Sequence, residues 1–266
     1  MSDVPSDRWR EGAAYEAYMG RWSRPLANAF VAWLREAPGS HWLEVGCGTG
    51  ALTAAICADG EPASVVACDP SASFVEHARA QLADPRVSFV VAGVDALPAR
   101  AGGFDAVASA LVFNFLPDAR AAVAAMRERL RPGGSLAACV WDYADGMELL
   151  RVFWDEAAAI DARAAALDEG ARFPLCRASA LASLFRECDL DDLRDDALAI
   201  ATDFASFDDY WAPFLRGTGP APSYVASLDA VGREALRARL ERRLAPRAGA
   251  PVRLRARAWA VRGVAH

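Results

Sequence analysis

Short apolar segments and amphipathic segments alternate along the first half of the chain. Residues 11–36 carry apolar side chains at helical spacing, with Trp22, Leu26, Phe30 and Leu34 on about one face, and Pro25 falls near a helix start where proline is tolerated. We therefore expect two helices before the core. Beyond residue 40 the pattern predicts strands at 41–46, 64–69, 86–92, 104–110 and 134–141, and helices at 50–58, 71–82 and 118–130. This alternation is typical of an α/β fold with a doubly wound, Rossmann-like, mainly parallel sheet.

The pattern changes after Asp142. Helices are expected near 147–168 and 179–188 and a strand at 193–204, and the alternation in "VRLRARAWAV" predicts an edge or antiparallel last strand at 252–264. An aromatic-rich segment lies between these last two strands. We divide the chain into an N-terminal helical cap, 1–40; an α/β core, 41–204, with a helical insertion at about 147–175; a second insertion, 205–246; and the final strand, 247–266.

Composition removes several classes of function. The net charge of −6 at pH 7, without a basic cluster, argues against nucleic acid as a partner. All 29 positive residues are arginine, so neither a lysine Schiff base nor a P-loop lysine is available. Three dispersed histidines and six cysteines without a C-x-x-C pair predict no metal site.

Apolar runs such as "SFVVAGV" are far shorter than the ~20 residues of a membrane-spanning helix, so no span is expected. No signal peptide is recognisable. We therefore expect a cytoplasmic protein with reduced, mostly buried thiols.

The stretch "HWLEVGCGTGALT" holds the strongest chemical signal. Gly46, Gly48 and Ala51 satisfy the G-x-G-x-x-G/A dinucleotide pattern, and Asp69 follows at the distance of a ribose-binding acid. Glu44 and Gly50 extend this to E-x-G-x-G-x-G. An acid at the strand end favours a cationic ligand and would repel a pyrophosphate.

Together with "ACDPS", "FDAVASA" and "RPGGSLAACVW", this turn resembles the class I S-adenosylmethionine-dependent methyltransferases, in particular the branch of the ubiquinone and menaquinone biosynthesis C-methyltransferases. The resemblance covers about residues 40–142, and "YEAYMGRWS" is similar to an uncharacterised subgroup. It implies S-adenosyl-L-methionine as cofactor and methyl transfer to an N, O or C nucleophile. The expected acceptor is a small apolar or aromatic molecule.

The resemblance also implies a set of cofactor-binding residues. The glycines leave room for the ligand on the backbone, Glu44 lies near its amino group, Asp69 accepts the ribose hydroxyls, and Arg21 either pairs with its carboxylate or is solvated. Related enzymes carry Gly-Asp-Ala after the third strand where this chain has Ala92, Gly93 and Val94, so either the backbone of Val94 or the side chain of Asp95 contacts adenine. The expected set is Tyr18, Arg21, Glu44, Gly46, Cys47, Gly48, Gly50, Asp69, Pro70, Gly93, Val94, Asp95, Ser109 and Ala110.

Catalytic candidates lie where strands end. Asp142 and Tyr143 follow the fifth strand and could act as general base or substrate anchor, although Asp142 is as readily an ordinary loop acid. Asn114 is expected to face the substrate. In-line methyl transfer needs alignment and exclusion of water more than acid–base chemistry. The aromatic residues Phe173, Phe204, Phe207, Tyr210, Trp211 and Phe214 either form a lid over the acceptor or pack as core.

Two other functions remain open at this point. A nicotinamide-dependent oxidoreductase fits the glycine spacing, but the chain lacks the tyrosine–lysine pair or second lobe of such enzymes. A methyltransferase-like binding protein without catalysis fits the same motif. The acceptor, the pathway and the oligomeric state are not indicated by the sequence.

Overall fold

The computed structural model describes residues 19–216, 219–245, 247 and 249–266. Its centre is a seven-stranded sheet in the order β3-β2-β1-β4-β5-β7-β6, in which β7 runs in the direction opposite to the other strands. The expected doubly wound sheet with an antiparallel last strand is confirmed. The edge position considered for that strand is wrong, because β6 lies outside β7. The strands are β1 (His41–Val45), β2 (Ser64–Asp69), β3 (Val87–Val91), β4 (Phe104–Ala110), β5 (Leu130–Trp141), β6 (Asp191–Ala201) and β7 (Arg255–Val264).

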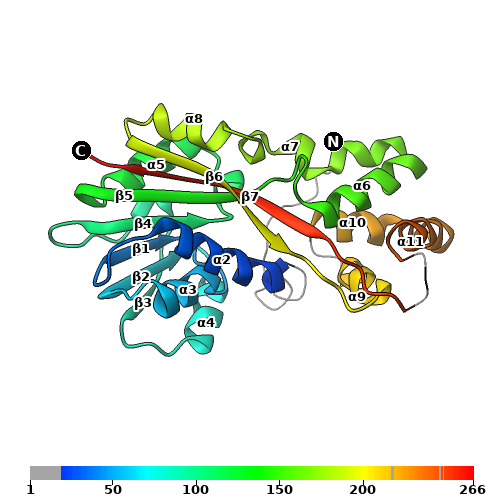
Figure 1. Cartoon of the computed structure of the whole chain (residues 1–266), viewed down its shortest axis with the longest axis horizontal. Coiled ribbons are helices and arrows are strands. Elements are labelled where there is room, and N and C mark those ends of the chain that lie inside the picture. The colour runs from blue at the N-terminus through cyan, green and yellow to red at the C-terminus, as the bar shows by residue number, and fades with distance from the viewer. Residues whose placement is uncertain (1–18, 217–218, 246, 248) are drawn as a thin grey trace.

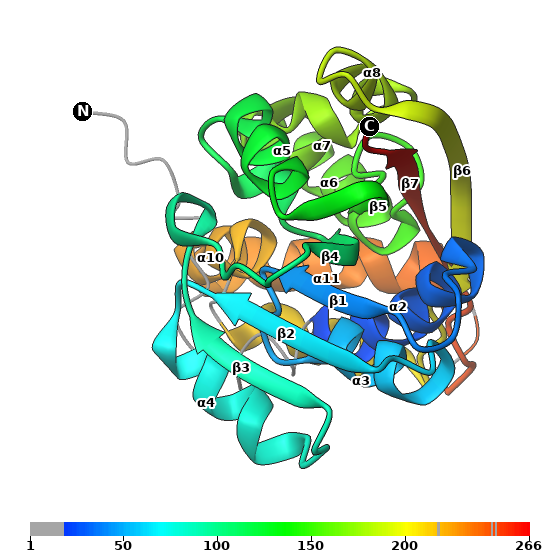
Figure 2. The ribbon, with the colours of Figure 1, turned by 90° about the vertical axis from the view of Figure 1, so that its left-hand side faces the viewer.

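Helices cover both faces of the sheet (Figure 2). One face carries α2 (Arg21–Leu34), α3 (Ala51–Asp59) and α4 (Ala72–Gln81), and the other carries α5 (Ala119–Arg127) and α8 (Ala180–Arg186). The hydroxyl of Ser71 accepts a hydrogen bond from the N–H of Phe74 at 3.4 Å and so caps the N-terminus of α4. Burial on both faces explains why the central strands read as continuous apolar runs.

The sequence "RPGG" does not stop β5 as expected. Leu130 of β5 pairs with Phe104 of β4, and Ser135 pairs with Ala106. Between these two pairs β5 advances by five residues and β4 by two, so β5 contains a bulge of three additional residues. Gly133 has a φ of +74°, which glycine adopts without strain. The breaker residues therefore form an irregularity inside the strand.

A second, helical layer lies beyond the carboxyl end of the parallel strands (Figure 1). Two chain segments build it, one after β5 and one between β6 and β7. The first contains α6 (Glu148–Ile160) and α7 (Glu169–Arg172), with 3₁₀ turns at Ala162–Leu167 and Pro174–Cys176. The second contains α9 (Phe207–Trp211), a 3₁₀ turn at Ala212–Arg216, α10 (Pro220–Ser227) and α11 (Ala230–Leu244).

This helical layer has its own aromatic core. Phe153 of α6 stacks on Phe214 with ring centroids 4.6 Å apart, and the hydroxyl of Tyr210 donates to the carbonyl of Leu149 at 2.9 Å. Phe204, Phe207 and Trp211 are buried as well. Of the two alternatives for these aromatic residues, a lid over the acceptor or packing in a core, their burial favours packing.

All six cysteines are buried and free of disulfides. Within the described ranges, no helix combines the length and apolarity needed to cross a membrane.

Candidate functional site

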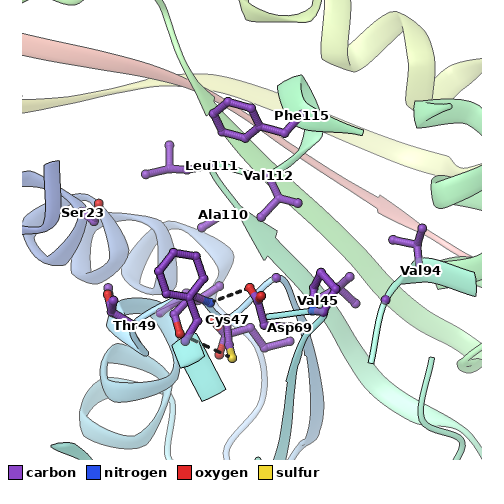
Figure 3. A pocket seen from close by; sticks show the side chains of 18 of the residues that line it. Ser23, Val45, Cys47, Thr49, Asp69, Val94, Ala110, Leu111, Val112 and Phe115 are labelled. Atoms are coloured by element: carbon purple, nitrogen blue, oxygen red, sulfur yellow. Dashed lines mark hydrogen bonds between the residues drawn. The ribbon is translucent and has the colours of Figure 1, made fainter. Parts of the chain in front are cut away.

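A cavity of about 380 Å³ opens at the carboxyl end of β1, β2 and β4 (Figure 3). This volume lies within the range of small-molecule sites. Its walls come from the turn after β1, the ends of β2 and β3, the segment after β4 and helix α2. The residues that line it are Ser23, Leu26, Ala27, Glu44, Val45, Gly46, Cys47, Gly48, Thr49, Ala51, Leu52, Asp69, Pro70, Phe74, Ala92, Gly93, Val94, Asp95, Ala110, Leu111, Val112, Phe115 and Leu116.

The three glycines of the turn have different surroundings. A β-carbon added at Gly48, where φ is +51°, would meet nothing within 4 Å, so this position keeps the cavity open. A β-carbon at Gly46 would lie 2.4 Å from Cγ2 of Val112, so this glycine permits close packing of the segment after β4. Gly50 packs instead against Ala78 of α4 and does not line the cavity. The structure thus gives Gly50 a packing role, and the cofactor contact expected for it stays a prediction.

Asp69 ends β2 and closes one side of the glycine turn. Its Oδ2 accepts the N–H of Gly48 at 3.0 Å, and its Oδ1 accepts the N–H of Ser71 at 2.9 Å. Burial raises the pKa of this carboxyl, and the two backbone N–H groups oppose that rise. Asp69 thus holds the turn together while it presents a carboxyl to the cavity.

Glu44 lies on β1, two residues before the turn, and is 1% exposed. The hydroxyl of Thr53, on α3, donates a hydrogen bond to its Oε2. Burial raises the pKa of Glu44 to about 8, with a further increase from the nearby charge of Asp69. The site therefore pairs two carboxyls, and none of the described residues that line it is arginine or histidine.

The end of β3 closes a third side. Gly93, Val94 and Asp95 all line the cavity, and the last two lie in a 3₁₀ turn at Val94–Ala96. The N–H of Ala92 donates to the carbonyl of Asp69 at 3.1 Å, which ties this turn to the end of β2. Both alternatives for adenine, the backbone of Val94 and the side chain of Asp95, are consequently at the cavity wall.

The opposite wall is apolar. Leu111, Val112 and Phe115 follow β4 (Figure 3). Leu116 also follows β4, and Leu26 comes from α2. Phe115 is 39% exposed, and its ring lies 5.6 Å from that of Phe173. Phe173 in turn lies 5.8 Å from the ring of Tyr143, so aromatic side chains continue from the cavity into the helical layer.

Besides Gly50, two expected cofactor-binding residues, Arg21 and Ser109, lie elsewhere. Arg21 pairs with Asp209 of α9 at 3.0 Å and lies over the rings of Trp22 and Phe204, so this side chain joins α2 to the helical layer. Ser109 is 1% exposed, and its hydroxyl donates to the carbonyl of Val45 at 2.7 Å. Neither lines the cavity.

Asp142 is buried and bound by Arg257 of β7, whose Nε lies 2.8 Å from its Oδ2. The ion pair with Arg257 favours the alternative of an ordinary structural acid, because Asp142 does not line the cavity, and the role as general base stays a prediction. Tyr143 is 8% exposed and packs on Phe173 without reaching the cavity. Tyr18 lies outside the described residues.

Asn114 lies between two residues of different exposure, the buried Phe113 and the exposed Phe115. Its Nδ2 is buried without a hydrogen-bond partner among the described residues, and Asn114 does not line the cavity. Its expected place facing the substrate is therefore not seen in this structure.

Several cavity residues were missed in the sequence. Ser23 and Ala27 lie one helical turn apart on α2, and Thr49, Leu52 and Phe74 surround the glycine turn. The only available signal for Ser23 and Ala27 was their small size on an otherwise bulky apolar face. Small side chains indicate that another group can approach the helix closely, but they do not indicate which ligand this group belongs to.

Comparison with known proteins agrees with this geometry. Residues 43–134 match the family model described as a methyltransferase domain. A trans-aconitate 2-methyltransferase of Deinococcus radiodurans is 34% identical over 111 residues, 42% of this chain and 42% of that protein. A ubiquinone biosynthesis O-methyltransferase of Xanthomonas campestris pv. campestris is 35% identical over 115 residues, 42% of this chain and 47% of the relative. The matches thus span less than half the length of these curated relatives.

Solved structures share the fold over more of the chain. The YcgJ protein from Bacillus subtilis has a TM-score of 0.57 at 15% identity, covering 91% of this chain and 99% of that one. Phosphoethanolamine N-methyltransferase 2 of Haemonchus contortus, in complex with S-adenosyl-L-methionine, has a TM-score of 0.59 at 14% identity, covering 96% of this chain and 56% of that one. The sheet order, the glycine turn and the matched domain together show that residues 43–134 form a methyltransferase domain, and that the chain has the fold of solved methyltransferase structures.

Proposed function

We propose that this protein transfers the methyl group of S-adenosyl-L-methionine to a nucleophilic N, O or C atom of a small, largely apolar molecule. The observation that carries the proposal is the open space over Gly48, flanked by the carboxyls of Glu44 and Asp69. A ligand with an amino group and a ribose fits two acids without an opposing cation. A pyrophosphate, as in a nicotinamide cofactor, would be repelled by the carboxylate of Asp69 and would find no cation in the described lining.

The residues present fit such a cofactor. Gly46, Cys47 and Gly48 would lie along its amino-acid portion, Glu44 near its amino group and Asp69 at its ribose. When bound, the cofactor supplies a methyl group on a positively charged sulfur. This chain's contribution is to align that methyl group with the acceptor and to exclude water, effects together worth up to roughly 7–11 kcal/mol.

The chemistry of the acceptor follows from the opposite wall. Leu26, Leu111, Val112, Phe115 and Leu116 offer apolar surface, and no described residue of the cavity offers a positive charge. An anionic acceptor would therefore be repelled by Asp69 and Asp95, whereas a neutral apolar acceptor would bury its surface against this wall.

Calorimetry and an isotope assay test the proposal. We expect S-adenosylhomocysteine to bind and NADH not to bind, and we expect radiolabelled methyl groups to pass to neutral apolar acceptors in preference to carboxylates. Binding of NADH alone would favour an oxidoreductase. Binding of S-adenosylhomocysteine without transfer to any compound of a broad acceptor panel would favour a non-catalytic binding protein.

A further inference from the structure

Glu44 and Thr53 form a buried pair beneath the cavity. Glu44 is 1% exposed and Thr53 is 0% exposed, and the hydroxyl of Thr53 donates to Oε2 of Glu44. Thr53 is the third residue of α3, so the helix that follows the glycine turn supplies this donor. Thr53 itself does not line the cavity, whereas Glu44 does.

The groups that face Glu44 do not favour its charge. Asp69, from β2, adds a repulsive carboxyl, and the thiols of Cys47, Cys57 and Cys68 lie close enough for an electrostatic interaction with it. On the other side β1 pairs with Ala108 of β4, which carries no titratable group. Thr53 is the neighbour that stabilises the carboxylate, and burial nevertheless raises the pKa of Glu44 to about 8. At neutral pH the ligand-free site therefore holds Glu44 mainly as the neutral acid.

We propose that Thr53 is a positioning residue for Glu44, and that binding of a cationic amino group in the cavity converts Glu44 to its carboxylate and releases a proton. The bond that breaks is the O–H bond of the Glu44 carboxyl. The proton passes to solvent, and the hydroxyl of Thr53 remains as donor to the carboxylate. The inference rests on the proposed function only in placing that amino group beside Glu44.

The sign of the pH dependence follows from this balance. The ligand favours ionised Glu44, so its apparent affinity is reduced by the fraction of protein that is still protonated. Affinity for S-adenosylhomocysteine should rise with pH, by up to about tenfold per pH unit below pH 8, and should level off above it. A site whose carboxylates are already ionised would show no such rise.

Calorimetry of the whole protein measures the proton directly. S-adenosylhomocysteine is titrated at pH 7 in two buffers that differ in their ionisation enthalpy, and the difference in heat gives the number of protons released. We expect a value approaching one for the unmodified protein and near zero for Glu44→Gln. Release that persists undiminished in Glu44→Gln would assign the proton to Asp69 and overturn the proposal.

Three threonine variants test the positioning role. Thr53→Val removes the donor, so the midpoint of the affinity profile should move to higher pH by about one unit, the equivalent of one hydrogen bond to a charged group. At neutral pH this corresponds to roughly tenfold weaker binding. Thr53→Ser keeps a hydroxyl and should restore the original midpoint.

Thr202→Val is the matched control. Thr202 is also a fully buried threonine, but it follows β6 and does not line the cavity, and its hydroxyl has no hydrogen-bond partner among the described residues. This variant should keep the original profile. Should Thr53→Val lose its fold, the two-buffer measurement on the unmodified protein still decides whether a proton is released.

The two proposals fail in different ways. Absence of S-adenosylhomocysteine binding at every pH would overturn the function proposed above. Binding with no proton release and no change of affinity between pH 6 and 8 would leave that function intact and would overturn the coupling through Glu44 and Thr53.

Discussion

At the scale of single residues, the glycine turn shows that one residue type serves separate purposes. Gly48 opens the cavity, Gly46 admits Val112, and Gly50 admits Ala78. All three have positive φ, but only the space at Gly48 is free. Substitutions at these positions should consequently fail for different reasons.

Gly48→Val should abolish binding of S-adenosylhomocysteine without unfolding the chain, because the new side chain occupies the open volume. The φ of +51° adds strain of about 1–2 kcal/mol. Gly39→Val is the matched control, since Gly39 has a φ of +78°, open surroundings and no contact with the cavity. Calorimetry and circular dichroism should show equal folding of the two variants and loss of binding in Gly48→Val alone; equal binding would refute the site assignment.

Asp69→Ala should weaken S-adenosylhomocysteine by roughly 1.5–3 kcal/mol, the range for hydrogen bonds to a charged group, because Asp69 both orders the glycine turn and faces the cavity. Asp95→Ala should cost less, since among the described residues Asp95 accepts no such hydrogen bond from the glycine turn, and the backbone of Val94 lies at the same wall. Titrations that give the opposite order would identify Asp95 as the stronger contact.

Glu44 and Asp69 could be assigned from sequence because local spacing places them at the ends of adjacent parallel strands. The role of Asp142 could not be assigned from sequence, because its partner Arg257 is 115 residues away and no local sequence pattern indicates this ion pair. The same holds for Arg21, whose partner Asp209 is 188 residues away. Local sequence motifs can therefore identify a binding site. Ion pairs between residues far apart in sequence determine which charged side chains near the site face the cavity and which are bound elsewhere.

At the scale of elements, strand periodicity located β2 and β4 at their observed bounds, 64–69 and 104–110. These strands are short apolar runs between polar turns, so their ends are clear. The course of β5 through "RPGG" was not foreseen, because the bulge depends on the register with β4. The order of β6 and β7 in the sheet likewise depends on pairing and not on local pattern.

Arg257→Ala should destabilise the fold more than Asp142→Ala. The pair holds the turn after β5 against β7, where the N–H of Asp142 also donates to the carbonyl of Arg257. Removing Arg257 leaves a carboxylate whose side chain is 2% exposed, at a cost of about 3–5 kcal/mol, whereas Arg257 is 38% exposed and can be solvated.

Urea unfolding of both variants measures this difference. Binding of S-adenosylhomocysteine to Asp142→Asn should remain unchanged, because Asp142 lies away from the cavity. A selective loss of turnover in Asp142→Asn, with stability preserved, would instead return Asp142 to the role of general base.

Trp211→Ala should lower the free energy of unfolding by about 3–5 kcal/mol, because Trp211 is 5% exposed and packs on Phe214 in the core of the helical layer. The Trp211→Ala substitution should lower the free energy of unfolding equally with and without bound S-adenosylhomocysteine. Leu215→Ala, at a side chain that is 54% exposed, is the neighbouring control and should change little. Intact melting with a selective loss of turnover would show that Trp211 acts as part of a lid.

At the scale of the whole molecule, two buried acids couple stability to pH. Glu169 of α7 is 4% exposed and accepts a hydrogen bond from Nε1 of Trp154 at 2.5 Å. Burial raises its pKa to about 7, and that of Glu44 to about 8, from an ordinary value of 4.5. Between these values the native state holds protons that the unfolded chain releases.

The free energy of unfolding of the ligand-free protein should therefore fall as pH rises. The contribution of each acid is complete below pH 4.5 and is lost as pH passes through about 7 for Glu169 and about 8 for Glu44. Glu169→Gln should remove on the order of 3 kcal/mol of this pH dependence. Urea unfolding at pH 5 and pH 8 measures it; equal slopes for the variant and the unmodified protein would contradict the expectation.

The attachment of the second helical segment has a consequence for how such a protein can diversify. Ala201 lies opposite Arg255, and Phe204 opposite Val252, so the segment leaves and re-enters the sheet at neighbouring points of one antiparallel ladder. It is in effect the loop of a long hairpin, and the entropy of closing such a loop grows only with the logarithm of its length. A helical segment of another length could replace the one between β6 and β7 without changing the register of any parallel strand. The helical layer of this architecture can thus be replaced in part by grafting at one hinge, while the glycine turn and the cavity, which no described residue of this segment lines, stay intact.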